Sequence, residues 1–206
     1  MKKLLVFLVL MTSAVFLHAE EYKEGVHYKM LPQVTTAASD KIEVLEFFWY
    51  GCPHCYSFEP YVKNWKKTLP ANVTFARVPA IFRPDWEIQA RTYYALRNMG
   101  LIETIHGKIF DAIHKNKKRL NTLDAMTDFV EKSGVDRKKF MDEYKSFGVD
   151  GFVRKAKKKQ SEYKIQGVPG IVVNGKYLVS GSMAGSYDNM VKIIDHLIAL
   201  ESKTTS

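Results

Sequence analysis

The chain of 206 residues contains only two cysteines, Cys52 and Cys55. A protein of an oxidising compartment that used disulfides for stability would usually carry several. A bond between such close neighbours would also constrain the unfolded chain very little. We therefore interpret the pair as a reactive site rather than as a disulfide that stabilises the fold. The fold must then depend on a hydrophobic core, and a chain of this length with 46% hydrophobic residues can build one.

Several other features are absent. After residue 19, no apolar run approaches the roughly 18 residues of a membrane-spanning helix. The sequence also has no internal repeat, no low-complexity linker, no phosphate-binding glycine loop and no nucleophilic serine motif. These absences argue against a repeat protein, a nucleotide-dependent enzyme and a serine hydrolase.

The first 19 residues have the pattern of a secretory signal peptide. Lys2 and Lys3 provide a positive start, Leu4–Leu17 is apolar, and Ala19 is a small residue at the expected cleavage point. The apolar run is too short for a membrane anchor, which needs roughly 18 residues or more. We predict a signal peptide over residues 1–19 that is cleaved, and a mature protein exported to the periplasm of a bacterium.

The positive charge is most concentrated in Arg154–Lys159, within a chain of formal net charge +9. No aromatic platform for bases is interleaved there, and an exported protein rarely meets nucleic acid. We interpret the stretch as the solvated face of a helix and expect no nucleic-acid partner. Weak attraction to anionic lipid head groups is the alternative.

The first half of the mature sequence predicts a strand, a helix and a second strand. Apolar residues indicate a strand over 42–49, a helix begins near the cysteine motif, and Val73–Val78 forms the next strand. This order describes a βαβ unit. From about residue 85 to residue 164 the apolar spacing is helical, and Thr122 and Asp136 are placed to cap two of four predicted helices.

Strand signals return near the C-terminus. Ile171–Val173 and Lys176–Val179 flank Asn174-Gly175, a strong signal for a two-residue hairpin turn. Ser186 can cap a final helix with a helically spaced apolar stripe. That stripe consists of Met190, Ile193, Ile194, Leu197 and Ile198. The whole order predicts an α/β fold with a mixed sheet and a helical insertion. The predicted parts are residues 20–82 and 165–206 for the α/β domain and 83–164 for the insertion.

Cys52-Pro53-His54-Cys55 is the motif that carries chemistry. Two thiols separated by two residues can switch between a dithiol and a disulfide. Cys52 should lie exposed at a helix start, where unpaired backbone N–H groups and the helix dipole favour a thiolate. Pro53 is tolerated in the first turn, and His54 can further stabilise the Cys52 thiolate. Cys55, one turn into the helix, is the covered thiol that resolves the reaction.

Glu46 and Pro169 are two further candidate site residues. Glu46 interrupts an apolar strand, and a buried carboxylate is costly unless it is protonated or paired. It could therefore exchange a proton with Cys55. The alternative is an edge-strand carboxylate that faces solvent. Pro169 precedes a strand, and since X-Pro bonds are cis in only about 5–6% of cases, the residues alone predict a trans turn.

Two stretches resemble the DsbA family of thiol:disulfide interchange proteins of the bacterial periplasm. They are Glu46–Glu59, which contains Cys-Pro-His-Cys, and Gly167–Pro169 followed by Val173–Tyr177. The resemblance covers essentially the whole mature chain. It implies a thioredoxin-like domain interrupted by an inserted α-helical subdomain.

The resemblance also assigns roles to individual residues. It implies that Pro169 is cis and packs beside Cys52, and that Val168 offers backbone hydrogen bonds to a bound substrate peptide. It further implies that Glu46 is the buried acid. Some family members pair this acid with a lysine on the next strand. Here residues 73–78 include no lysine, with Phe75 at the expected position and Arg77 close by.

The residues and the resemblance together predict a thiol–disulfide oxidoreductase. It would donate the Cys52–Cys55 disulfide to unfolded or reduced exported proteins through a mixed disulfide at Cys52. The resemblance implies reoxidation by a DsbB-like, quinone-linked membrane protein. We expect a monomer that needs no cofactor and no metal.

Two alternatives remain open. A disulfide reductase or isomerase is the nearer one, although isomerisation normally needs dimerisation and no N-terminal dimerisation domain is visible. A metal-binding module is the other, since Cys52, His54 and Cys55 could bind copper or zinc. The sequence offers no second Cys/His cluster at ligand spacing. Three histidines scattered over helices are predicted to be packing or surface residues, namely His106, His114 and His196.

Overall fold

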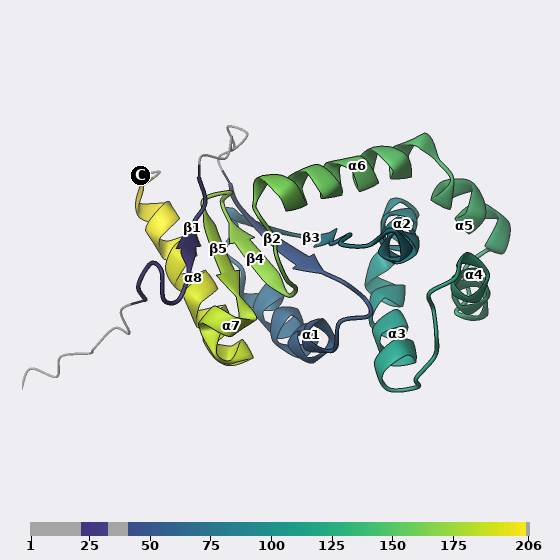
Figure 1. Ribbon diagram of the computed structural model, residues 1–206, viewed down its shortest axis with the longest axis horizontal. Helices are drawn as coiled ribbons and strands as arrows, with labels where there is room; N and C mark the ends of the chain where they lie inside the picture. The colour runs from purple at the N-terminus through teal and green to yellow at the C-terminus, as the bar shows by residue number, and fades with distance from the viewer. Residues whose placement is uncertain (1–21, 33–40, 205–206) are drawn as a thin grey trace, which may run out of the picture.

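Five strands form one mixed sheet (Figure 1). They are β1 (Lys29–Met30), β2 (Ile42–Phe48), β3 (Val73–Pro79), β4 (Gly170–Val173) and β5 (Tyr177–Ser180). The order across the sheet is β1-β5-β4-β2-β3; β2 and β3 pair in parallel, and the other neighbouring strands pair antiparallel. The predicted mixed sheet and C-terminal hairpin are confirmed. This computed structural model describes residues 22–32 and 41–204, so the predicted signal peptide lies outside the described residues.

Strand β2 lies between two neighbours and carries the acidic residue of interest. Its side chains alternate between the two faces of the sheet. Val44 belongs to the apolar cluster beneath the first and last helices, whereas Leu45 and Phe47 belong to the cluster on the other face. Glu46 therefore shares the face of Val44, and it is completely buried.

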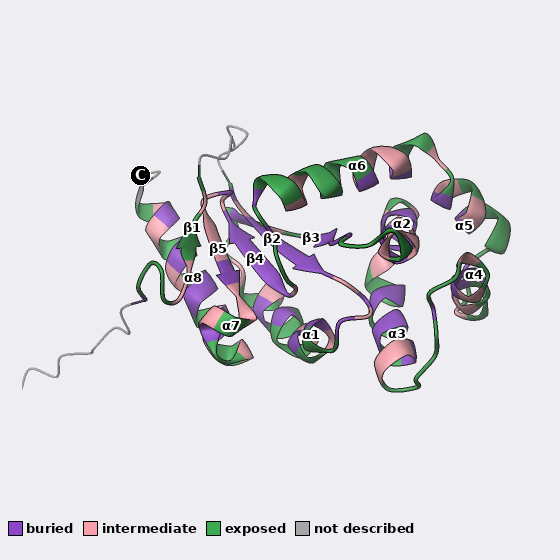
Figure 2. Cartoon of the chain, viewed as in Figure 1, coloured by how far each residue is buried: buried purple, intermediate pink, exposed green. Residues whose placement is uncertain are grey.

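Helices α1 (Pro53–Trp65) and α8 (Tyr187–Thr204) cover that face of the sheet. Helix α1 continues into a short 3-10 turn, η1 (Lys66–Thr68). The predicted apolar stripe of α8 is buried, and the Ser186 hydroxyl accepts a hydrogen bond from the Asn189 N–H at 3.1 Å, which confirms the predicted cap. Figure 2 shows that burial runs along β2 and β4 and covers only part of each helix.

Between β3 and β4 the chain is helical, as predicted. The elements are η2 (Pro84–Trp86), α2 (Glu87–Asn98), α3 (Ile102–His114), α4 (Leu123–Lys132), α5 (Arg137–Tyr144) and α6 (Phe147–Glu162). Thr122 and Asp136 accept hydrogen bonds from backbone N–H groups at the starts of α4 and α5, as predicted caps should. The sequence prediction of four helices missed α6 as a separate helix, which Ser146 caps through the Val149 N–H. A one-turn helix, α7 (Gly181–Ala184), was also missed.

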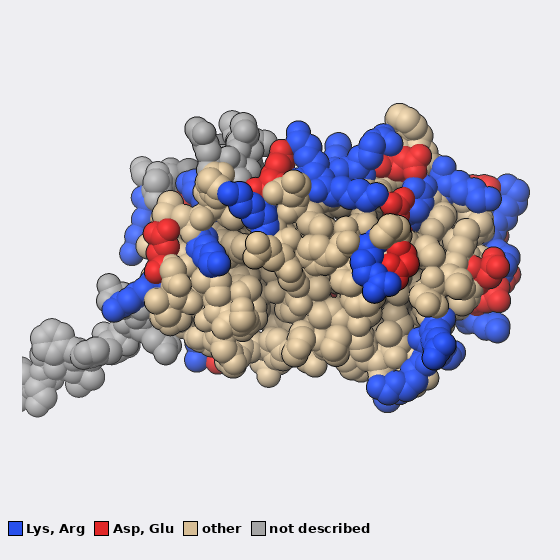
Figure 3. Space-filling view, viewed as in Figure 1, with Lys and Arg blue, Asp and Glu red and all other residues tan. Residues whose placement is uncertain are grey.

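The basic stretch Arg154–Lys159 lies on α6 and faces outward for the most part (Figure 3). Two of its lysines pair with acids of other elements, Lys157 with Glu87 at 2.6 Å and Lys159 with Glu43 at 3.3 Å. The interpretation as a solvated helix face fits this arrangement. Within residues 22–32 and 41–204, no helix combines the length and apolarity that crossing a membrane requires.

Candidate active site

The cysteine motif begins helix α1 directly after β2. Cys52 is the N-terminal cap, and its Sγ accepts a hydrogen bond from the Cys55 N–H at 3.3 Å. Pro53 occupies the first turn, where a missing N–H removes no helical hydrogen bond. Both cysteines are free thiols in this structure. The strand-to-helix placement predicted from the sequence is therefore confirmed.

Cys52 is less accessible than the sequence suggested. Its exposed fraction is 6%, against 0% for Cys55, so the expectation of an exposed Cys52 is wrong. The reason is the loop before β4, whose Val168 carbonyl oxygen lies 3.4 Å from Cys52 Sγ. The Val168–Pro169 peptide bond is cis. The resemblance predicted this conformation, whereas the trans turn expected from the residues alone is wrong.

The two thiols have opposite acidities. Hydrogen bonding from Cys55 is the main influence that lowers the pKa of Cys52, to about 6, and backbone N–H groups and the charge of His54 add to it against the effect of burial. Burial raises the pKa of Cys55 well above its ordinary value, and the neighbouring Cys52 sulfur adds to that effect. At neutral pH the reduced pair is therefore a thiolate at Cys52 and a thiol at Cys55.

A groove runs along one side of the motif. It has a volume of about 770 Å³, and its walls come from α1, the cis-proline loop and the start of α8. His54, Val168 and Pro169 all line it. The hydroxyl of Tyr187, another lining residue, lies 3.1 Å from His54 Nδ1. The predicted substrate-binding residues and His54 therefore share one surface.

Glu46 lies beneath the motif and is ion-paired. Arg77 Nε donates to Glu46 Oε2 at 2.9 Å, and Arg77 Nη2 donates to both oxygens of Glu59 at 2.9 and 3.1 Å. Arg77 is the register partner of Glu46 across the parallel pair. The sequence assignment of Phe75 to this place is therefore wrong, because Phe75 pairs with Val44 instead. The guanidinium of Arg77 is thus the cation that pairs with Glu46.

The two carboxylates that share Arg77 differ in proton affinity. Burial raises the pKa of Glu46 to about 7, although Arg77 opposes this shift. Burial also acts to raise the pKa of Glu59, but hydrogen bonds from His106 and Arg77 outweigh it, and the pKa lies below its ordinary value. Glu46 Oε1 is buried with no hydrogen-bond partner among the described residues. Glu46 is thus the carboxyl group suited to exchange a proton near pH 7.

The comparisons with known proteins agree with this geometry. A family model described as the DSBA-like thioredoxin domain matches residues 76–194. The chain is 41% identical over 184 residues to the thiol:disulfide interchange protein DsbA of Pseudomonas aeruginosa, covering 89% of this chain and 87% of the relative. It is 42% identical over 191 residues to DsbA of Azotobacter vinelandii, covering 92% and 89%. The chain belongs to the DsbA family.

Solved DsbA structures also match the fold. The crystal structure of Pseudomonas aeruginosa DsbA superposes with a TM-score of 0.86 at 42% identity, covering 90% of this chain and 97% of that structure. The predicted thioredoxin-like fold with a helical insertion is confirmed. As a member of the DsbA family, the protein is a thiol–disulfide oxidoreductase.

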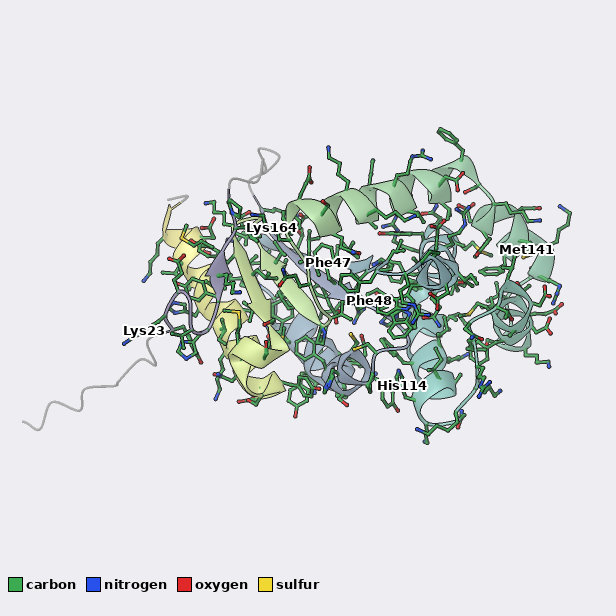
Figure 4. The ribbon with its side chains drawn as sticks, viewed as in Figure 1. Lys23, Phe47, Phe48, His114, Met141 and Lys164 are labelled. Carbon is green, nitrogen blue, oxygen red and sulfur yellow. The ribbon has the colours of Figure 1, made fainter. Side chains whose placement is uncertain are left out.

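Sequence reasoning missed a buried extension of this DsbA-type site. His106 Nε2 lies 3.0 Å from Glu59 Oε1, and His106 Nδ1 lies 2.8 Å from the hydroxyl of the buried Tyr50. His114, on the same helix α3, places Nε2 2.8 Å from the Tyr50 carbonyl oxygen. Figure 4 shows Phe48 and His114 on the side of the sheet where α3 packs. The helical spacing of the two histidines, eight residues apart, was the available signal that they share a face.

No metal centre accompanies these residues in the described part of the chain. Over residues 22–32 and 41–204, the His, Cys, Asp and Glu side chains form no group of three or more that could hold a metal ion. His54 instead contacts Tyr187, and His106 contacts Glu59 and Tyr50. These contacts account for both histidines within the protein itself.

Gly51, directly before Cys52, leaves room for a stacked pair of tryptophans. A Cβ atom at Gly51 would lie 2.3–2.6 Å from three ring carbons of Trp49. That ring stacks on Trp86 with centroids 3.7 Å apart and an interplanar angle of 4°. Only glycine therefore permits the Trp49 ring to fold back over the backbone beside the motif.

Replacing Gly51 with Ala should separate the two tryptophans. The added methyl group forces the Trp49 ring away from Trp86, and the overpacking should lower the free energy of unfolding by about 1–3 kcal/mol. Near-ultraviolet circular dichroism reports the stacking, and urea denaturation reports the stability. Gly107→Ala is the control, because its Cβ meets nothing on an exposed helical position, and it should stabilise by about 0.5–1 kcal/mol. Equal effects of the two substitutions would contradict this account.

Proposed function

We propose that the protein oxidises other proteins by donating the Cys52–Cys55 disulfide. The observation that carries the proposal is the opposite acidity of the two thiols, with the pKa of Cys52 lowered to about 6 and that of Cys55 raised. A stabilised thiolate is a good leaving group, so a disulfide that contains it is easily reduced by another thiol. The pair therefore favours donation of its disulfide to a substrate over reduction of a substrate disulfide.

The reaction proceeds through a mixed disulfide. A substrate thiolate attacks Cys52 Sγ, the Cys52–Cys55 bond breaks, and Cys55 leaves with the electron pair and takes up a proton. The second substrate thiol loses its proton and attacks the substrate sulfur of the mixed disulfide, which releases Cys52 as a thiolate. In total, two substrate thiols become one disulfide and the protein disulfide becomes a thiolate and a thiol, with one proton released to solvent.

Glu46 supplies and receives the proton at Cys55. With a pKa of about 7 it is present in both protonation states near neutral pH. It lies near enough to Cys55 for its charge to raise the pKa of that thiol. The protonated acid therefore neutralises Cys55 when it leaves, and the carboxylate accepts the proton when Cys55 attacks during reoxidation.

The substrate lies in the groove beside the motif. Its backbone pairs with Val168, and its reactive sulfur approaches Cys52 beside the cis-proline. Substrates are unfolded or reduced proteins, and the cell compartment is the periplasm, to which the signal peptide directs the chain. A DsbB-like membrane protein linked to quinone reoxidises the pair. Residues 83–164 form the helical insertion, whose helix α3 packs against α1 through His106 and Glu59.

The test is transfer of the disulfide to a reduced, unfolded peptide with two cysteines. The oxidised protein should convert one peptide to its disulfide per molecule and finish as the dithiol. Mass spectrometry after an acid quench should show a transient adduct on Cys52. If the dithiol protein instead reduces the oxidised peptide efficiently at equal concentrations, the protein is a reductase and the proposal is wrong.

A further inference from the structure

Helix α8 brings a phenol hydroxyl to the histidine of the redox motif. The Tyr187 hydroxyl and His54 Nδ1 lie 3.1 Å apart, although the two residues are 133 positions apart in the chain. Both side chains line the groove that reaches Val168, whose carbonyl oxygen contacts Cys52 Sγ. Tyr187, which lies outside the motif, therefore contacts the motif at the His54 side chain.

The Tyr187 side chain is held in place from two directions. Gly185, with φ of +73°, turns the chain between α7 and α8, and the Ser186 cap fixes the first turn of α8. The Tyr187 ring lies 5.6 Å from the ring of the fully buried Phe58 and 5.6 Å from the ring of Tyr61, both on α1. The hydroxyl is thus presented to His54 by a packed ring.

The Tyr187 hydroxyl can form a hydrogen bond with His54 in two ways that leave a hydrogen on Nε2. A phenol can donate to a neutral imidazole nitrogen and can accept from a protonated one. With the neutral ring, donation from Tyr187 to Nδ1 places the ring hydrogen on Nε2; with the charged ring, Nδ1–H donates to Tyr187 and Nε2 also carries a hydrogen. In these two arrangements His54 carries an N–H at Nε2 that can interact with an anion. His54 is also one of the groups whose charge favours the Cys52 thiolate.

We infer that Tyr187 is a positioning residue for the redox reaction, which orients His54 and keeps Nε2 protonated so that His54 stabilises the Cys52 thiolate. The inference rests on the proposed disulfide donation, because it concerns how strongly that disulfide tends to be reduced. Tyr187 acts through His54 and not on the sulfur itself. Cys55 and Tyr61 also face the pair, and the charged Asp188 lines the same groove.

The test is a double-mutant cycle between Tyr187→Phe and His54→Ala. Tyr187→Phe retains the packed ring and removes only the hydroxyl. We expect the pKa of Cys52 to rise, measured by thiolate absorbance, and the equilibrium with glutathione to shift about three- to tenfold toward the disulfide form. In the His54→Ala background, Tyr187→Phe should change neither quantity, because the group on which it acts is gone.

A matched control and a second readout separate positioning from folding. Tyr56→Phe removes a hydroxyl from α1, the helix that carries His54. The Tyr56 hydroxyl lies away from the groove and donates to Asp111 over a distance of 2.8 Å. Its removal should leave the pKa of Cys52 unchanged. Equal shifts for Tyr187→Phe with and without His54, or a lower pKa of Cys52 in Tyr187→Phe, would overturn the inference. Neither the pKa of Cys52 nor the equilibrium with glutathione requires a protein substrate. Both measurements therefore remain interpretable even if donation of the disulfide to proteins fails.

Discussion

The dithiol form of the protein should gain stability relative to the disulfide form by about 1.4 kcal/mol for each pH unit above about pH 6. The reason is the Cys52 thiolate, whose pKa falls from an ordinary value of 9.0 to about 6 in the folded protein. Between these values the folded dithiol has lost a proton that the unfolded chain retains. Stability therefore rises with pH across this window and is lost as the pH falls through about 6.

The total gain has an upper limit set by the three-unit shift. That limit is about 4 kcal/mol. Above about pH 9 the trend reverses, because the raised pKa of Cys55 keeps that thiol protonated in the folded protein while the unfolded chain ionises. The informative range is therefore from about pH 6 to about pH 8.5.

Urea denaturation of both redox forms across this range measures the effect. The difference in unfolding free energy between the dithiol and disulfide forms should rise with pH by about 1.4 kcal/mol per pH unit, which is the slope expected for one proton. Cys52→Ser supplies the control, since a reduced protein without the thiolate should show no such rise relative to the wild-type disulfide form. A difference that stays flat with pH would show that the folded protein does not stabilise the thiolate.

Replacing Cys55 with Ser should stop turnover and leave the protein trapped on its substrate. Cys52 still forms mixed disulfides, but the protein has no second thiol of its own, so a partner with a single cysteine cannot be released. At pH 7 a thiol of pKa about 6 is about nine-tenths ionised, whereas one with a pKa above 9.0 is at most about 1% ionised. The thiolate population at Cys52 thus exceeds that at Cys55 by about 100-fold.

The reciprocal variant is the control for this prediction. Cys52→Ser leaves only the fully buried Cys55, so alkylation by iodoacetamide at pH 7 should be at least about 100-fold slower than in Cys55→Ser. Incubation of each variant with the disulfide-linked dimer of a peptide that has a single cysteine, followed by non-reducing electrophoresis, should show an adduct only for Cys55→Ser. Adducts of equal yield on both variants would contradict the assignment of Cys52 as the attacked sulfur.

Local sequence signals predicted those parts of the fold that depend on neighbouring residues. The caps at Thr122 and Asp136 bind the first-turn N–H groups as expected, and Asn174-Gly175 joins two paired strands. The boundary between α5 and α6 was not predicted, because Ser146 lies within a stretch where the helical apolar spacing continues. The cap at Ser146 is recognised only from the hydrogen bond that its hydroxyl accepts from the Val149 N–H.

Contacts between distant segments account for what sequence reasoning missed at the site. The cover over Cys52 comes from Val168, so no local pattern could show that the sulfur is nearly buried. The partner of Glu46 depends on strand register, and a shift of two residues separates Phe75 from Arg77. The contact between His54 and Tyr187 joins two helices at opposite ends of the chain.

The cis-proline loop also has a consequence for the order in which the site is made. Val168 follows Cys52 by 116 positions in the sequence, and it lies directly before β4, which pairs with β2. During synthesis both cysteines therefore leave the ribosome long before the loop that covers them. An incomplete chain carries the redox pair without its cover or its groove, so the protein is itself an unprotected dithiol substrate until its last fifth has been made.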